Sequence, residues 1–378
     1  MSDHLTKLRE QMEAVGLDLV LLTEPMDVAY VSGFRFDPFE HIAVLCVPLD
    51  ENVRFLLPGY EEAGVARAVP DETELFMFPE VGVDTEAFED CMSGLAHHAR
   101  IGVTASTIPV TAQERLMRAL NRDSFHDCSE LLGSLRAVKD DEEIALIAEA
   151  SRIGDRAVER MIDESLCVGA VEAELGGDLS RILRYEGADG SAFEPGLTAG
   201  WRSALPHGPD HSRARGNRPG QDAIDSGELL VFDFSVVVGG YIADLSRTYV
   251  LGESEPKQRE IFEIVQEAQQ AAIDACIPGN PVGDVDRVAK QIIANAGYGE
   301  CSPQKTGHGV GLELHELPYV AATTDQVLET GMIFCIEPAI YLEGYGGARV
   351  EDVVLVTDDG PRVLTDRTNQ KQLELPVT

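Results

Sequence analysis

The sequence predicts an α+β protein in which a small N-terminal α/β domain precedes a larger domain of helices and antiparallel strands. Before residue 133, short apolar runs are separated by Pro, Gly and Asp turns. A polar, charged stretch follows at 133–141, and beyond it long amphipathic segments alternate with pairs of β-rich runs. With 378 residues, 44% of them hydrophobic, the chain can form two or three domains. We expect domains at 1–133 and 139–378.

The N-terminal domain begins with a predicted helix. Leu5, Leu8, Met12 and Val15 recur at intervals of three and four residues, which is the spacing of one helix face. Apolar runs then predict strands at 19–22, 42–47, 53–57 and 75–78. The pair His97–His98 is expected on the surface, where most histidines without a specific role lie.

The second domain is predicted to start with acidic residues at 140–143, which favour the first turn of a helix. The apolar periodicity predicts helices at 142–164, 170–187, 256–276 and 282–297. Strand pairs are expected at 228–250 and 332–357, joined by short turns and therefore antiparallel.

The composition is strongly acidic, with 66 Asp and Glu against 30 Lys and Arg, a formal net charge of −36. Such a charge disfavours nucleic acid and anionic membranes as partners. Most of the basic residues are Arg, and this pattern is typical of proteins from a salt-rich cytoplasm, where salt screens the self-repulsion. We hypothesise a halophilic protein.

Seven cysteines lie scattered through the chain without a CxxC pair. An odd number without paired spacing disfavours a disulfide framework or a zinc ribbon and fits a reducing compartment. The first residues are charged and contain no apolar signal core, and no apolar run reaches the roughly 18 residues of a membrane helix. A cytoplasmic protein is expected.

The segment 229–250 contains two β-rich runs around Gly239–Gly240, a dipeptide suited to a tight hairpin turn. That turn would pair Asp233 with Ser246. Asp244 would then lie one diagonal from Asp233 on the same face, because residues two apart on a strand point the same way. Two carboxylates on an apolar hairpin are costly without a counter-charge, so a divalent cation is predicted between them.

Three further residues can complete such a site. His308 lies in the glycine-rich segment TGHGVG, where the missing side chains permit close approach of backbone and ligand. Glu337 ends one apolar run and Glu351 begins another. Four carboxylates and one imidazole suit two divalent ions such as Mn²⁺, Co²⁺ or Zn²⁺. Cys335 has apolar neighbours and is expected in the core.

The order Asp, Asp, His, Glu, Glu, with the aspartates 11 apart (244 − 233) and the glutamates 14 apart (351 − 337), resembles the pita-bread metallopeptidases. Among them, Xaa-Pro dipeptidases and aminopeptidases are the most similar. The segment 8–34 resembles the N-terminal domain of creatinase and prolidase, and LRAVK at 135–139 resembles the family's linker. The resemblance implies a creatinase/prolidase-like domain followed by a pita-bread catalytic domain.

The resemblance also implies residue roles and cofactors. Asp233 would bind one metal ion, His308 and Glu337 the other, and Asp244 and Glu351 both. It further implies catalytic or substrate-facing roles for His207, His315, Glu337, Tyr341 and Arg349. Two divalent ions would be the cofactors, with manganese first and cobalt or zinc as alternatives. A small peptide substrate and a homodimer are implied as well.

The implied reaction is hydrolysis of the peptide bond preceding proline by a metal-activated water. Three alternatives stay open: a dipeptidase or a longer-peptide aminopeptidase, a hydrolase of a small compatible-solute amide, and a binding-only pseudo-peptidase. The basic loop at 211–220 is either merely solvated or a lid that offers Arg to an acidic substrate end.

Overall fold

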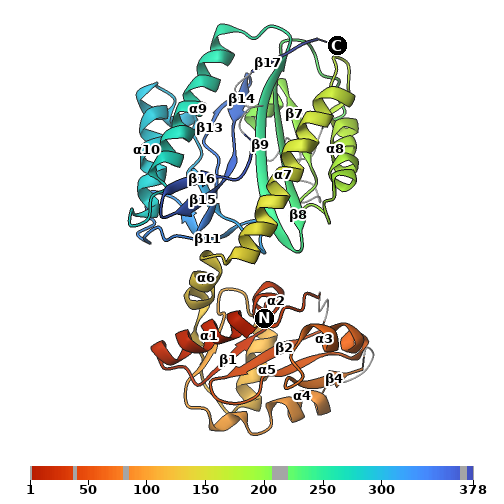
Figure 1. The fold of residues 1–378 in the computed structure, drawn as a ribbon, viewed down its shortest axis with the longest axis vertical. Helices are drawn as coiled ribbons and strands as arrows, with labels where there is room; N and C mark the ends of the chain where they lie inside the picture. The colour runs from red at the N-terminus through yellow and green to blue at the C-terminus, as the bar shows by residue number, and fades with distance from the viewer. Residues whose placement is uncertain (1, 37–40, 80–84, 207–219, 367–372, 378) are drawn as a thin grey trace. The chain divides into compact units, whose positions relative to one another are not determined.

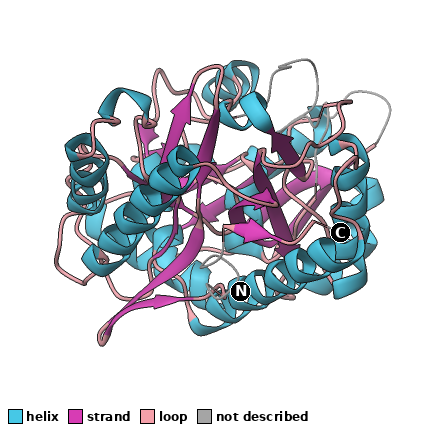
Figure 2. Cartoon of the chain, turned by 90° about the horizontal axis from the view of Figure 1, so that it is seen from above, coloured by secondary structure: helices cyan, strands magenta, loops and turns pink. Residues whose placement is uncertain are grey.

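The computed structural model describes residues 2–36, 41–79, 85–206, 220–366 and 373–377. The chain divides into two compact units, Met1–Arg136 and Ala137–Thr378. Both units contain helices and strands, and Figure 2 shows these elements for the chain coloured by secondary structure. Among the described residues, no helix has both the length and the apolar character needed to cross a bilayer.

The first unit contains a six-stranded mixed sheet of order β4-β3-β2-β1-β5-β6. Its strands are β1 (Leu19–Leu22), β2 (Val44–Pro48), β3 (Arg54–Pro58), β4 (Glu74–Phe78), β5 (Ile101–Val103) and β6 (His126–Asp127). Its α-helices are α1 (Ser2–Val15), α2 (Pro25–Ser32), α3 (Glu62–Ala68), α4 (Thr85–Met92), α5 (Val110–Ala119) and α6 (Ser129–Ala137), which ends one residue into the second unit. The four predicted strands are confirmed within two residues at each end, and the predicted N-terminal helix is confirmed with its start three residues earlier, at Ser2.

The core of this unit lies on the apolar faces that the sequence pattern indicates. Leu8 and Met12 of α1 are fully buried. Leu19 and Leu21 of β1 pack in one cluster with Phe88 of α4 and with other apolar side chains of the sheet. Alternate side chains of β1 therefore face this cluster, although the whole strand is buried.

The described residues of the second unit form three sheets and four long helices. The sheets have the orders β17-β9-β8-β7, β11-β10-β12-β15-β16 and β13-β14. Their strands are β7 (Gly196–Ala199), β8 (Leu229–Val238), β9 (Tyr241–Leu251), β10 (Gly307–Gly309), β11 (Glu316–Val320), β12 (Ile333–Ile336), β13 (Ala339–Leu342), β14 (Gly346–Arg349), β15 (Asp352–Thr357), β16 (Gly360–Val363) and β17 (Glu374–Leu375). The helices are α7 (Asp141–Glu164), α8 (Glu172–Glu186), α9 (Pro256–Ala275) and α10 (Val282–Asn295), which confirms the four that periodicity predicts.

Helix α7 packs against one face of the β8–β9 hairpin (Figure 1). It begins at Asp141 because Asp140 accepts hydrogen bonds from the first backbone N–H groups, and Glu143 returns a bond to the Asp140 N–H. Midway along α7, Gly154 lets the helix approach the hairpin, because a Cβ there would meet the methyl groups of Leu245 at 3.0 Å. The apolar face of the hairpin is thereby sealed, and its other face is left for polar side chains.

Helices α9 and α10 cover the five-stranded sheet in the same way (Figure 1). Apolar side chains of both helices share one buried cluster with Phe334 of β12 and Val354 of β15. An isolated antiparallel bridge between Ser246 of β9 and Glu351 joins the hairpin's sheet to the strands that follow β14. This junction brings together segments that are about a hundred residues apart in sequence, and the candidate site lies there.

Candidate metal centre

The β8–β9 hairpin has the predicted register. Val238 pairs with Tyr241 across Gly239–Gly240, and both glycines have positive φ. Asp233 pairs with Ser246, and Asp244 pairs with Ser235. The two aspartates therefore lie on one face of the hairpin, one diagonal apart, and both are more than nine-tenths buried.

Arg349 and Ser246 form the polar floor beneath Asp233. The guanidinium of Arg349 donates to Asp233 Oδ2 and, through Nε, to Ser246 Oγ at 2.8 Å. Ser246 Oγ lies 3.1 Å from Asp233 Oδ1 and 2.7 Å from Glu351 Oε2. A hydroxyl has one hydrogen, so Ser246 donates to one of these carboxylates at a time while accepting from Arg349.

His308 stands on β10 with its ring fixed by the backbone. Its Nδ1 donates to the carbonyl oxygen of Gly309 at 3.1 Å, which leaves the lone pair on Nε2 available as a ligand. The glycines around it permit close strand packing, because a Cβ on Gly307 would overlap the carbonyl oxygen of Cys335. The expectation that these glycines remove bulk is confirmed. Cys335 is fully buried, as expected, and faces His308 across the sheet.

A carboxylate of α10 anchors the segment that carries His308. Asp286 is fully buried and accepts from Thr306 Oγ1 at 2.6 Å and from the backbone N–H of Ala322 at 2.8 Å. Its two oxygens therefore tie α10 to the residue before β10 and to the residues after β11. The position of His308 depends on this connection as well as on the sheet.

Glu337 and Glu351 lie at strand ends, as their sequence context predicts. Glu337 follows β12, its side chain is 19% exposed, and its Oε1 lies 3.4 Å from His308 Nε2. Glu351 precedes β15 and is 1% exposed. Asp233, Asp244 and Glu351 each offer an oxygen within 4.8 Å of the others, and Glu351 also forms a group of this kind with His308 and Cys335.

Burial and mutual repulsion make these carboxylates difficult to ionise. Burial, with the charges of Glu351, Asp233 and Glu337, raises the pKa of Asp244 well above its usual value. Burial and the charge of Glu337 do the same to the pKa of Glu351. Burial lowers the pKa of His308 well below its usual value, so its imidazole is neutral near pH 7.

The residues present fit a pair of divalent cations. Glu351 Oε1 is buried without a hydrogen-bond partner, and a cation would satisfy it. Arg349 directly neutralises one carboxylate of four, so positive charge is still needed. The 3.4 Å between His308 Nε2 and Glu337 Oε1 matches the separation of about 3.3 Å between two ligands that lie about 2.0 Å from one tetrahedral ion.

Two further predicted residues lie beside this centre. His315 is exposed, and its ring centroid is 4.0 Å from that of His308. Tyr341 Oη accepts from Arg349 Nη1 at 3.1 Å, and burial raises the pKa of Tyr341 to about 12. His207 and residues 211–219 of the basic loop lie outside the described residues.

Sequence reasoning gave no role to two residues of this centre. Ser246 was placed opposite Asp233 by the hairpin register, and that position was the available signal for its contacts. The positive charge of Lys305 acts on this centre, where it lowers the pKa of both His308 and Glu337. Nothing in the sequence indicates this, since Lys305 is a single basic residue in a loop.

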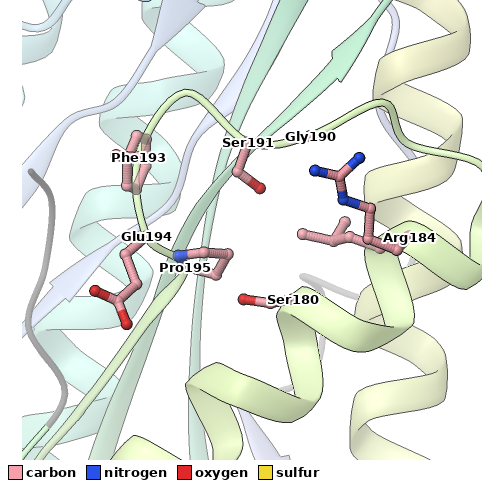
Figure 3. Close-up of a pocket in the computed structure, with 8 residues that line it drawn as sticks. Ser180, Arg184, Gly190, Ser191, Phe193, Glu194 and Pro195 are labelled. Carbon is pink, nitrogen blue, oxygen red and sulfur yellow. The ribbon is translucent and has the colours of Figure 1, made fainter.

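A separate hollow of about 340 Å³ lies beside the loop that precedes β7. Figure 3 shows Ser180 and Arg184 of α8 on one side and Ser191, Phe193 and Glu194 of the loop on the other. None of the five candidate ligands lines it, so it is not the metal centre. The loop itself is held to the site-facing side of the hairpin.

Ser235 makes that attachment. Its Oγ accepts from the backbone N–H of Ala192 at 2.8 Å. Ser235 stands opposite Asp244, so the loop containing Phe193 runs close to the carboxylates.

Comparisons with known proteins agree with this architecture. The model of metallopeptidase family M24 matches residues 145–358, and that of the creatinase/prolidase N-terminal domain matches residues 4–138. "Putative dipeptidase YkvY" of Bacillus subtilis is 32% identical over 365 residues, covering 96% of this chain and 97% of the relative.

Solved structures are similar over nearly the whole chain. An Xaa-Pro dipeptidase from Bacillus anthracis is 29% identical with a TM-score of 0.87, and the match covers 99% of each chain. The prolidase from Pyrococcus horikoshii is 31% identical with a TM-score of 0.85, covering 96% of this chain and 98% of that one. The fold is thus the two-domain pita-bread fold that the sequence predicts. The chain is a metal-dependent peptidase and belongs to metallopeptidase family M24, with a creatinase/prolidase domain at its N-terminus.

Proposed function

We propose that Asp233, Asp244, His308, Glu337 and Glu351 hold two divalent metal ions and that the protein hydrolyses the peptide bond preceding proline. The observation that carries the proposal is the shared position of Glu351, which belongs to one donor group with the aspartates and to another with His308. A carboxylate within reach of two donor groups can bridge two ions.

The contacts support a division of the ligands between the two ions. Asp233 contacts Arg349 and shares the Ser246 hydroxyl with Glu351, whereas His308 lies beside Glu337. The charges of the three other carboxylates all raise the pKa of Asp244, so Asp244 lies close to each of them. This position suits a second bridging ligand. This arrangement agrees with the roles that the family resemblance implies.

The proposed chemistry needs the ions for one part and the chain's own side chains for the rest. When bound, the two ions lower the pKa of a water molecule and polarise the scissile carbonyl. Glu337 is partly exposed, so we assign it the proton that the water loses and its delivery to the departing proline nitrogen.

Arg349 and His315 complete the proposed site. Arg349 holds Asp233 and Tyr341 in place. His315 is exposed beside His308 and is positioned to donate a hydrogen bond to the substrate. A stabilising role for His207 rests on the resemblance alone.

The proposed specificity for proline is supported by the similarity to two solved structures, an Xaa-Pro dipeptidase and a prolidase. Manganese is the first metal to test, because carboxylates dominate the donor set, with cobalt and zinc as alternatives. A homodimer is inferred from the resemblance. A reducing, salt-rich cytoplasm is inferred from seven free thiols and the acidic composition.

The test is hydrolysis by metal-reconstituted protein in high salt. The substrates are Xaa-Pro dipeptides, Xaa-Pro tripeptides, matched dipeptides without proline, and N-acyl or cyclic amides. Cleavage of Xaa-Pro dipeptides alone selects a prolidase, and cleavage of tripeptides an aminopeptidase. Cleavage of the amides alone, or bound metal without hydrolysis, would reject the proposal in favour of the solute hydrolase or the binding protein.

Variants test metal binding and proton transfer by different readouts. Glu337→Gln should lower kcat by at least about 100-fold, the lower end of a general acid–base contribution. Asp244→Asn should lower both activity and metal affinity, because it removes a proposed bridging ligand. The matched control is Glu343→Gln, a nearby acidic residue that is exposed and belongs to no donor group among the described residues. Full activity in either site variant would contradict the assignment.

A further inference from the structure

Three side chains of the N-terminal unit form a second cluster of metal-binding groups. Glu51 follows β2, and His97 and His98 precede β5. Each offers one ligand atom, and these atoms lie within 4.8 Å of one another. Glu51 Oε1 is 3.3 Å from His97 Nε2 and 4.0 Å from His98 Nε2. The peptidase chemistry proposed above uses none of the three.

His98 has a buried ring nitrogen that lacks a hydrogen-bond partner. The surface expectation is right for His97, which is 62% exposed, and wrong for His98, which is 9% exposed. His98 Nε2 is buried without a hydrogen-bond partner and faces the Glu51 carboxylate at a distance too long for a hydrogen bond. Burial and the neighbouring His97 lower the pKa of His98, so its ring is neutral and has a lone pair for a metal.

His97 is held in the tautomer that a metal ligand requires. Its Nδ1 contacts the carbonyl oxygen of Gly94, and a carbonyl can only accept, so Nδ1 carries the hydrogen. In the neutral ring the lone pair is then on Nε2, the atom that faces Glu51. A ligating histidine usually has its other nitrogen bonded in this way.

The loop that carries both histidines is fixed from three sides. Arg54 donates to the carbonyl oxygens of Cys91 and Ser93, and Arg122 donates to those of Ala96 and His98. Asp18 accepts from the two backbone N–H groups that follow His98, at 2.9 and 2.8 Å.

This support is also an electrostatic environment for the cluster. Arg54 and Arg122 are nearby cations that oppose a metal ion, and the Arg54 guanidinium also pairs with Glu74 at 3.4 Å. Asp18 adds a negative charge that acts on His98. The ligands are thus presented by an ordered backbone in surroundings that a cation can enter.

We propose that Glu51, His97 and His98 bind one borderline divalent transition metal such as Zn²⁺, tying the turn after β2 to the loop before β5. Two imidazoles and one carboxylate suit Zn²⁺, Ni²⁺ or Cu²⁺ better than the hard Mg²⁺ and Ca²⁺. The 3.3 Å edge between His97 and Glu51 already matches the ligand spacing around an ion at about 2.0 Å. The 4.0 Å edge closes through small rotations of Glu51, which is 43% exposed.

Zinc binding by the full-length, metal-stripped chain tests this site. Equilibrium dialysis counts the zinc ions bound by the wild type, Glu51→Gln, His97→Ala and the control His126→Ala, which removes an exposed histidine of the same unit. The two site variants change exposed side chains, so their folding is preserved. Each should bind one zinc fewer or weaken that one by at least about tenfold, since loss of even an outer-shell partner costs that much.

The outcomes are distinct from those for the peptidase centre. Peptidase activity should be equal in all four proteins, and a zinc anomalous signal should lie between Glu51 and the two histidines. Equal zinc stoichiometry and affinity in wild type and His97→Ala would overturn the proposal, as would an equal loss in His126→Ala. Failure of the peptidase assays would leave the difference between these variants unchanged.

Discussion

Replacing Ser246 by alanine tests whether the polar floor of the metal centre positions its ligands. The hydroxyl is fully buried, accepts from Arg349 Nε at 2.8 Å and donates to Glu351 at 2.7 Å or Asp233 at 3.1 Å. Two hydrogen bonds to charged groups are lost together, each worth about 1.5–3 kcal/mol. Arg349 and Asp233 retain each other, so we expect the lower end of the sum, about 3 kcal/mol of unfolding free energy.

The same change should weaken metal binding, because the loss of a group that orients ligands typically costs about 10–100-fold in affinity. Urea unfolding in chelator measures the stability, and activity against buffered free Mn²⁺ measures the affinity. The control is Ser235→Ala, which removes an equally buried hydroxyl from the same face of the hairpin. Ser235 Oγ accepts from the backbone N–H of Ala192 and, in the described part of the chain, hydrogen-bonds to none of the five ligands.

Ser235→Ala should therefore lower stability without changing the Mn²⁺ concentration for half activity. Wild-type metal affinity in Ser246→Ala would refute the reasoning, because the carboxylates would then hold their positions without the hydroxyl. Equal affinity losses in both variants would also refute it, since the effect would follow from hairpin stability alone.

Three other measurements test the electrostatics. Burial raises the pKa of Asp244 and Glu351, so the unfolding free energy of the metal-free protein should fall as pH rises above about 4. Added Mn²⁺ should raise the unfolding free energy more near pH 8 than near pH 5.5, because the carboxylates must be ionised to bind it. The reverse order would argue against ligation by these carboxylates. Burial also raises the pKa of Asp155 to about 6, so wild type should lose stability relative to Asp155→Asn between about pH 4 and pH 6, as urea midpoints at each pH would report. With a net charge of −36, the melting temperature should rise between about 0.1 and 1 M KCl, where the screening length falls from about 10 to 3 Å; a melting temperature independent of salt would contradict the halophile hypothesis.

Local signals in the sequence were sufficient for the parts of the fold that depend on neighbours along the chain. Gly239–Gly240 determines the hairpin register, so the facing of Asp233 and Ser246 follows from counting residues. Helix α7 starts where Asp140 and Glu143 form a capping box. The long helices are confirmed because each has several turns of apolar periodicity.

Other features depend on tertiary contacts that no local pattern carries. Strand β10 is Gly307–Gly309, without β-favouring side chains on the glycines, and it exists because β11 and β12 pair with it on both sides. Helix α2 has eight residues and is almost entirely buried, so it shows no amphipathic period. The burial of His98 depends on packing and long-range contacts, so it cannot be predicted from the sequence next to the exposed His97.

The hairpin joins the metal centre and the hydrophobic core in one register. Asp233 and Asp244 share a face with Ser235 and Ser246, whereas Phe234 and Leu245 point to α7. A one-residue slip in the pairing of β8 with β9 would turn Phe234 or Leu245 towards the two glutamates. It would also turn an aspartate towards α7, where there is no room for it. Apolar packing against α7 therefore selects the arrangement that gathers the acids, and the fold can bear their repulsion because the same packing supplies the stabilisation. Ligand geometry in this protein should consequently be more sensitive to the turn at Gly239–Gly240 than to most residues nearer the ions.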